Sequence, residues 1–230
     1  MLDPCFIGMG IEQDKDVICK AVTKDGADEK VASFTMKDGK VNILEHDEIT
    51  PLMAKEKDRN GRLKYNLGSI MVYLFKVSKL LDICKDSEQL NKMYHKHSRI
   101  VPVWIEEMQK SDTPEKDNAY KFELFVHNCL SFVDKEKFGL LVVEREDEFA
   151  PVKNGPGSEA DSPDTARQLL TEYHMKLFTE AGGQFSGEGD FEIDTLLTYD
   201  GEGLEQLAKE RAPFQLPGYL RENDTLDDSP

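Results

Sequence analysis

Residues 143–154 read V-E-R-E-D-E-F-A-P-V-K-N and contain the first candidate for binding chemistry. They overlap the apolar run 140–143, whose composition and charged boundary predict a buried strand. Pro151 fixes its own φ and biases the preceding residue toward extended backbone. Lys153 would therefore lie beyond a strand end, where open α/β sheets place ligand contacts. Acidic residues surround Arg145, so a solvated loop is the simpler interpretation of the same pattern.

Other polar residues lie at the ends of predicted elements. Glu45 ends a predicted hairpin, and an acidic strand end usually faces solvent. Lys121 falls near the start of a helix predicted over 120–138, where a cation opposes the helix dipole. That conflict hints at a role beyond stability, although an exposed lysine is the simpler interpretation. His95 and His97 are two residues apart, do not share a helix face and have no third ligand nearby, so no metal site is predicted.

The composition excludes some classes of partner. The chain has 230 residues, 39% of them hydrophobic, and a net charge of −16. That length allows one domain or somewhat more with a real core. The acidic charge argues against nucleic acid and anionic membranes, which need clustered Lys and Arg. The four cysteines match no metal or redox motif. Free thiols and a cytoplasmic location are expected, since no signal peptide or membrane-spanning run is present.

The elements that would position these residues form an α/β pattern. Residues 17–22 have the composition of a strand. Asp38-Gly39 predicts a hairpin turn between strands 31–36 and 41–44. A helix is predicted over 69–85 from apolar residues at the helical period. Residues 101–105 contain Pro102 and predict an edge strand.

The later part of the chain begins at a flexible linker. Residues 154–158 read N-G-P-G-S, which places a domain boundary between 154 and 155. Ser162, Pro163 and Asp164 predict a helix start, and Gly182-Gly183 its end. Residues from Pro217 onward are polar and acidic, and we expect them to be mobile.

Several motifs taken in series resemble the C-terminal half of eukaryotic UDP-N-acetylhexosamine pyrophosphorylases. The most specific is R-E-D-E-F-x-P-x-K-N at 145–154. The others are D-P-x-F-I-G at 3–8, N-G-R-L at 60–63, N-x-G at 66–68, T-A-R at 165–167, A-G-G at 181–183 and G-E-G-L-E at 201–205.

The resemblance implies a fold and an activity. Residues 1–154 would be the C-terminal portion of a Rossmann-like, GT-A-like nucleotidyltransferase domain with a mixed sheet. Residues 155–230 would form a small α+β domain with an acidic tail. The family transfers a uridylyl group from UTP to N-acetylglucosamine 1-phosphate, or its galacto epimer, and releases pyrophosphate with Mg²⁺. The implied partners are UTP or a UDP-sugar and a sugar 1-phosphate, with the chain a monomer or a weak homo-oligomer.

The same resemblance assigns candidate site residues. Lys153 and Lys121 match the family's phosphate-region lysines, and Glu45 matches the carboxylate that binds sugar hydroxyls. Phe125 matches an aromatic wall near the N-acetyl group. Four matching positions depart from the family pattern, so several sugar contacts are changed: Ala32 replaces Gly, His46 replaces Tyr, Ser69 replaces Asn, and His127 replaces an aromatic residue.

One departure is a family motif that is not found in this sequence. The family's Gly-rich L-x-x-G-G-x-G-T-R-L loop and its metal-holding Asp would lie upstream of Asp3, so this chain offers no metal ligand. Gly182-Gly183 does not replace the loop, because phosphate loops lead into a helix rather than follow one. We therefore expect no turnover by this chain alone. A non-catalytic protein that binds a sugar nucleotide or a partner is the alternative, and an α/β domain without a ligand is the third reading.

Overall fold

The computed structural model describes residues 3–222, which divide into two compact units. The first unit ends at Val142 and the second begins at Val143. Each unit has its own hydrophobic core. The domain roles predicted on either side of residue 154 stay predictions.

The first unit is built on a five-stranded sheet in the order β3-β2-β4-β1-β9. β1 pairs in parallel with β9 and antiparallel with β4, while β2 is antiparallel to β3 and β4. The sheet is therefore mixed, and the predicted α/β class with a mixed sheet is confirmed. The strands are β1 (Val17–Thr23), β2 (Ser33–Lys37), β3 (Lys40–Leu44), β4 (Leu67–Phe75) and β9 (Phe138–Val142).

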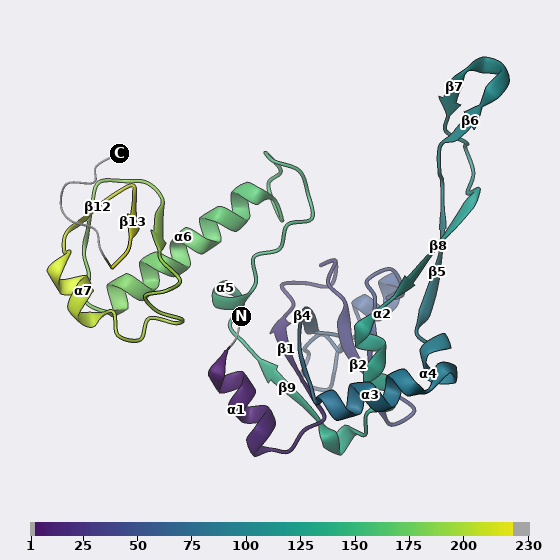
Figure 1. The fold of residues 1–230 in the computed structure, drawn as a ribbon, viewed down its shortest axis with the longest axis horizontal. Helices are drawn as coiled ribbons and strands as arrows, with labels where there is room; N and C mark the ends of the chain where they lie inside the picture. Colours follow the sequence, from purple (N-terminus) through teal and green to yellow (C-terminus); the bar gives the residue numbers. More distant parts are fainter. Residues whose placement is uncertain (1–2, 223–230) are drawn as a thin grey trace. The chain divides into compact units, whose positions relative to one another are not determined.

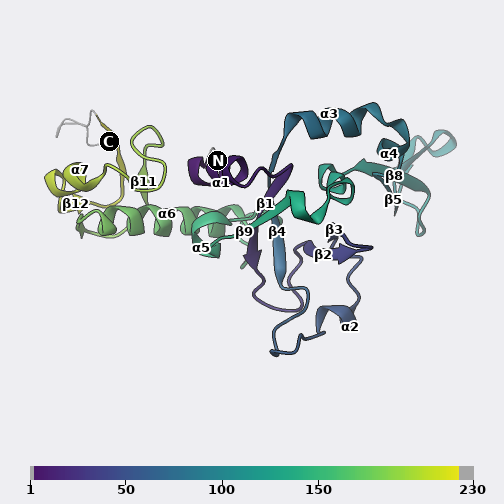
Figure 2. The same cartoon turned by 90° about the horizontal axis from the view of Figure 1, so that it is seen from below.

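Other segments cover both faces of the sheet at its strand β1. Helix α1 (Pro4–Glu12) covers one face, where a Cβ built on Gly10 would lie 3.0 Å from Ile18. Figure 2 shows α1 beside β1 and β9. On the other face, Cys19 packs in one cluster with Leu130 of the 3₁₀ segment η2 (Val126–Phe132). Strand β1 is thus buried from Val17 to Val22, as in a central strand.

The predicted strand 17–22 and the predicted hairpin are confirmed. The strand predicted over 140–143 is present as β9, but it lies at the edge of the sheet and Val142 is 50% exposed, so its predicted burial is wrong. Asp38 and Gly39 have φ values of 51° and 75°, so both turn residues adopt the left-handed region. The Asp-Gly pair favours this geometry because a two-residue hairpin of this kind needs positive φ twice. All four cysteines are free thiols, as expected.

The helix predicted over 69–85 is wrong in its first half. Those residues lie in β4, and only α3 (Val77–Lys85) is helical. Strand β4 lies between β2 and β1, so it is apolar on both faces and shows no two-residue alternation. An apolar run without alternation does not distinguish a buried strand from a helix.

The helix predicted over 120–138 is also wrong. This segment contains β8 (Ala119–Leu124), η2, η3 (Lys135–Lys137) and the start of β9. Strand β8 pairs with β5 (Tyr94–Arg99) over six residue pairs. That pairing between distant segments overrides the apparent helical period.

Strands β5 and β8 form an arm with the antiparallel pair β6 (Val103–Ile105) and β7 (Lys110–Asp112) at its far end (Figure 1). Trp104 at this end is 57% exposed. Its indole N–H donates to Glu106, which belongs to η1 (Glu106–Met108), at 2.6 Å. Because β6 pairs only with β7 among the described residues, the predicted edge strand is confirmed. The remaining helices of this unit are α2 (Pro51–Ala54) and α4 (Ser87–Asn91).

The second unit is organised around α6 (Pro163–Glu180), whose predicted start and end are confirmed. Ser162 and Thr165 form a reciprocal capping box at its start. Phe178 is fully buried at its end, with its ring centroid 5.0 Å from that of Phe185 and 5.3 Å from that of Phe191. The other elements are α5 (Arg145–Glu148), β10 (Phe185–Ser186), β11 (Phe191–Ile193), α7 (Glu205–Glu210), β12 (Phe214–Gln215) and β13 (Gly218–Leu220).

The mobile tail predicted from Pro217 begins too early. Strand β13 pairs in parallel with β11, and Leu220 is fully buried. The rest of that prediction, over 223–230, lies outside the described residues. Within 3–222, no helix has the length and apolar character that crossing a bilayer requires.

Candidate functional site

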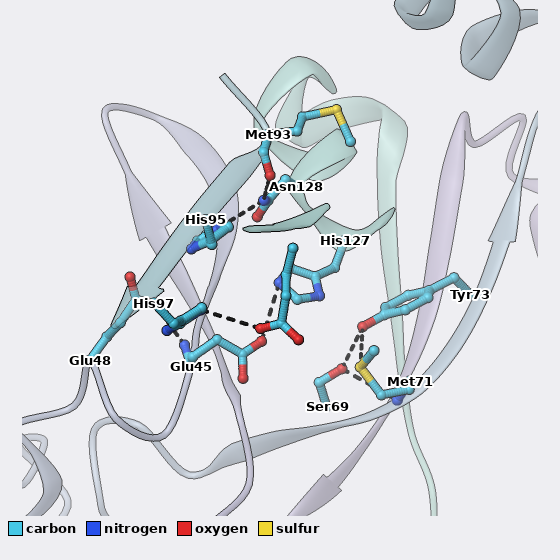
Figure 3. Close-up of polar contacts among 11 residues, drawn as sticks. Glu45, Glu48, Ser69, Met71, Tyr73, Met93, His95, His97, His127 and Asn128 are labelled. Carbon is cyan, nitrogen blue, oxygen red and sulfur yellow. Dashed lines mark hydrogen bonds and ion pairs between the residues drawn. The ribbon is translucent and has the colours of Figure 1, made fainter. Parts of the chain in front are cut away.

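The open end of the β2–β3 hairpin brings three predicted site residues together. Ser33 pairs with Leu44, so Ala32 and Glu45 flank this end, opposite the Asp38-Gly39 turn. The backbone N–H of Ser69 donates to the Ala32 carbonyl at 2.8 Å, which adds β4 to the same place. Figure 3 labels both Glu45 and Ser69 and shows Ser69 beside Tyr73 and Met71.

Ser69 is buried and its hydroxyl already has partners. Its Oγ lies 3.0 Å from the Tyr73 hydroxyl, and the Met71 N–H donates to it at 3.4 Å. Met71 has a φ of 62°, which bends β4 at this point. Burial raises the pKa of the Tyr73 phenol to about 12, so Tyr73 is a neutral hydroxyl. Tyr73 was not predicted from the sequence, because β4 was read as a helix.

Glu45 and His127 form the titratable pair of the site. The Nε2 of His127 lies 3.3 Å from Oε1 of Glu45, as the dashed line in Figure 3 marks. The His127 side chain is 1% exposed and the Glu45 side chain 21%. Burial raises the pKa of Glu45, with a smaller contribution from Asp47. Burial, aided by His95, lowers the pKa of His127 to about 4, so the imidazole is neutral at pH 7.

Aromatic rings line one side of this pair. Phe125 stacks on His127 with centroids 5.0 Å apart and ring planes 13° apart. His95 lies 5.0 Å from Phe125, and His97 stacks on His95 at 6.3 Å. The side-chain amide of Asn128 is 2.8 Å from Nε2 of His95 and donates to the Met93 carbonyl at 2.8 Å.

The sequence missed the part that His95 and Asn128 play in this site. The sequence analysis tests whether His95 and His97 share a helix face, and residues two apart in a helix point in different directions. They lie on β5, where residues two apart share one face. The alternation Tyr-His-Lys-His at 94–97 was the signal that could have revealed this. No group of three or more His, Cys, Asp or Glu within 3–222 is arranged to hold a metal ion.

The three remaining predicted site residues are His46, Lys121 and Lys153. His46 is exposed on the turn after β3. Lys121 is on β8 rather than at a helix start, and its Nζ is 2.5 Å from Oε1 of Glu123. Lys153 belongs to the second unit, where its Nζ lies 3.4 Å from Oδ2 of Asp161.

An open hollow of about 410 Å³ borders the aromatic group. It is lined partly by His95 and Asn128 and partly by the charged residues Lys37, Glu48 and Lys92. A carboxylate, an aromatic face and neutral hydroxyls are groups that bind a polyhydroxyl ligand, because the carboxylate accepts from hydroxyls and the ring covers C–H surface. The arrangement contains no nucleophile activated by an adjacent base.

Comparisons with known proteins agree with the motifs. The chain is 34% identical over 207 residues to the UDP-N-acetylglucosamine pyrophosphorylase of Saccharomyces cerevisiae, which covers 89% of this chain and 43% of that protein. It is 34% identical over 245 residues to the human UDP-N-acetylhexosamine pyrophosphorylase-like protein 1, covering 99% and 47%. No family model matches the chain. The chain spans less than half the length of these relatives.

Solved structures add the fold. The UDP-N-acetylglucosamine pyrophosphorylase of Trypanosoma brucei, in complex with an inhibitor, matches with a TM-score of 0.76 at 27% identity, over 97% of this chain and 46% of that one. A structure from Entamoeba histolytica matches with a TM-score of 0.80 over 96% of this chain and 53% of that one. At 23% identity it supports the fold alone. The resemblance inferred from the motifs is confirmed, and the non-catalytic alternative is not favoured.

Proposed function

We propose that this chain, which resembles part of the UDP-N-acetylhexosamine pyrophosphorylases, carries the sugar-binding portion of an enzyme that joins a uridylyl group to a sugar 1-phosphate. One observation carries the proposal. Glu45 and Ala32 flank the hairpin end, where the Ala32 carbonyl accepts from the Ser69 N–H, and Glu45 lies within 3.3 Å of the His127 ring that stacks on Phe125. The polar and aromatic groups that a sugar requires are thus assembled by segments far apart in the sequence.

The residues have separate roles in the proposed reaction. Glu45 accepts hydrogen bonds from sugar hydroxyls, and Phe125 packs against the N-acetyl group. The sugar phosphate attacks the α-phosphorus of UTP in line, and pyrophosphate leaves. Lys121 and Lys153 neutralise phosphate charge, which is the main protein contribution in such transfers.

A metal is part of the proposed whole enzyme, because the resemblance implies Mg²⁺. The described residues do not fit it, since they contain no suitable group of three ligands. A Rossmann-like, GT-A-like domain, a small C-terminal domain, a cytoplasmic location and a monomeric or weakly associated state belong to the same proposal. The free thiols of the four cysteines support the reducing location.

The sugar site is tested by replacing its carboxylate. We expect Glu45→Gln to weaken the binding of UDP-N-acetylglucosamine by about tenfold or more, because a hydrogen bond to a charged group contributes about 1.5–3 kcal/mol. Titration followed by ¹H–¹⁵N NMR measures this on the 230-residue chain. Asp47→Asn is the matched control, since Asp47 is an exposed carboxylate on the same turn.

Two outcomes would contradict the proposal. The first is unchanged affinity in Glu45→Gln, and the second is equal weakening by Asp47→Asn. We also expect no pyrophosphate release when the chain alone is given UTP and N-acetylglucosamine 1-phosphate. Measurable turnover would show that the residues present suffice for catalysis.

A further inference from the structure

We infer that His127 is a positioning residue for Glu45: its neutral imidazole donates an Nε2–H hydrogen bond that orients the carboxylate toward the sugar hydroxyls. The inference rests on the proposed function for the ligand, while the Glu45–His127 bond itself can be tested without one.

His127 is held in place by burial and by stacking on Phe125. Its side chain is 1% exposed and stacked on Phe125 at 5.0 Å with nearly parallel rings. The imidazole therefore cannot rotate toward a different partner without losing its packing. The Glu45 side chain is 21% exposed, at the edge of the site, and has more room to move.

The ring nitrogens of His127 lack hydrogen-bond partners within residues 3–222. Within the described residues, neither ring nitrogen of His127 has a hydrogen bond of good geometry. Buried polar atoms without partners are rare, because each keeps the free-energy cost of losing water. The only carboxylate in ion-pair range of this imidazole among those residues is Glu45, at 3.3 Å from Nε2. A charge-assisted N–H···O bond is shorter, about 2.7–2.9 Å, so a small movement of Glu45 would close it.

The contact with Glu45 determines which ring nitrogen of His127 carries the proton. If the neutral imidazole carried its proton on Nδ1, the lone pair of Nε2 would face the carboxylate and repel it. A proton on Nε2 makes the same contact attractive, so the Nε2–H form is expected. This bond would hold the Glu45 carboxylate in one orientation. Its remaining lone pairs would then be positioned to accept hydrogen bonds from ligand hydroxyls.

The surroundings decide how the pair responds to acid. Asp47, Glu48 and His46 face Glu45 from the turn after β3, His95 faces both members from β5, and Tyr73 lies nearby on β4. Burial and the two acidic neighbours raise the pKa of Glu45, so its carboxylate gains a proton at a higher pH than an exposed glutamate does. A protonated Glu45 offers fewer acceptor sites to sugar hydroxyls. The Nε2–H donor opposes this protonation, because it stabilises the charged form.

Two variants separate the donor from the ring. His127→Phe keeps an aromatic ring against Phe125 and removes the donor. His127→Gln removes the ring and places an amide N–H near the position of Nε2. A role in packing alone would be preserved by Phe and lost with Gln, while a donor role would show the reverse.

The ligand-free experiment uses NMR of the 230-residue chain. Long-range ¹H–¹⁵N spectra of the unaltered chain should show His127 neutral with its proton on Nε2. A ¹³C titration of the Glu45 carboxyl should give a pKa higher by roughly one unit in His127→Phe than in the unaltered chain, with His127→Gln restoring much of the difference. An Nδ1–H form, or the same Glu45 titration in the unaltered chain and His127→Phe, would overturn the inference. The first measurement needs no variant, so a variant that fails to fold leaves it decisive.

The ligand experiment uses UDP-N-acetylglucosamine as the probe. In His127→Phe we expect the affinity to fall more at pH 5.5 than at pH 7.5, because the Glu45 carboxylate is protonated at higher pH in this variant. An equal loss at both pH values would contradict the positioning role. If the unaltered chain does not bind the probe at either pH, the proposed function fails, and the NMR result still decides whether His127 holds Glu45.

Discussion

Burial shifts the pKa values of the two titratable groups at the hairpin end in opposite directions, so the two groups change stability with pH in opposite ways. His127 has a pKa lowered from 6.5 to about 4, so between these values the unfolded chain binds more protons than the folded one. Stability is then lost as the pH falls from 6.5 to 4 and is fully present above 6.5. Glu45 has a raised pKa, so the folded chain takes up this proton at a higher pH than the unfolded chain does. Its contribution to stability therefore increases as the pH falls.

A comparison in the Glu45→Gln background isolates the histidine. There we expect the free energy of unfolding to fall by up to about 3 kcal/mol between pH 6.5 and pH 4 because of His127, from about 1.4 kcal/mol per pKa unit. Adding His127→Gln should remove this part of the slope. Urea unfolding at several pH values measures it, and identical slopes with and without His127 would contradict the assignment.

The site residues differ in how far the sequence could predict them. Glu45 and Phe125 were identified through motif resemblance, and the structure places both next to His127. His95 was missed because the alternation at 94–97 was not recognised as a strand, and the partner of that strand, β8, was predicted to be a helix. Tyr73 was missed because β4 itself was predicted to be a helix.

At the scale of elements, local signals predicted what local interactions stabilise. The Asp-Gly hairpin turn and the capped start of α6 were predicted correctly because a few adjacent residues determine each. Strands β4 and β8 were missed because their partners, β1 and β5, lie far away in the sequence. The spacing of apolar residues along the chain gives no information about such long-range pairing.

The capping box of α6 yields a prediction of its own. Ser162 is fully buried, and its Oγ accepts from the Thr165 N–H at 3.2 Å. We expect Ser162→Ala to lower the free energy of unfolding of the second unit by about 1–2 kcal/mol, since the helix loses its N-cap acceptor. Thermal unfolding measures the change. Gln168→Ala on the exposed surface of the same helix is the control, and an equal loss in both variants would rule out the capping effect.

At the scale of the whole molecule, each unit buries its own set of side chains. One cluster in the first unit includes Cys19, Phe34 and Leu130, and the cluster of the second unit includes Phe178 and Phe191. Substitutions in separate clusters without shared partners usually act independently.

The two clusters can be distinguished by one substitution. Phe178→Ala should destabilise the second unit by about 3–5 kcal/mol, because a buried ring is replaced by a cavity. Hydrogen exchange should then accelerate at α6 and β11 but stay unchanged at β1. Leu170→Ala is the control, since Leu170 lies on the same helix and is 45% exposed. Faster exchange at β1 in Phe178→Ala would show that the two clusters unfold together.

The position of Trp104 at the end of the β5–β8 arm decides what fluorescence can report. It is the only tryptophan of the chain, and more than half of its side chain is already exposed. Its emission wavelength would change little when either core unfolds, because the indole is hydrated before and after. A fluorescence melt would therefore describe the tip of the arm, while a shift toward blue emission on adding another molecule would indicate that something covers this tip.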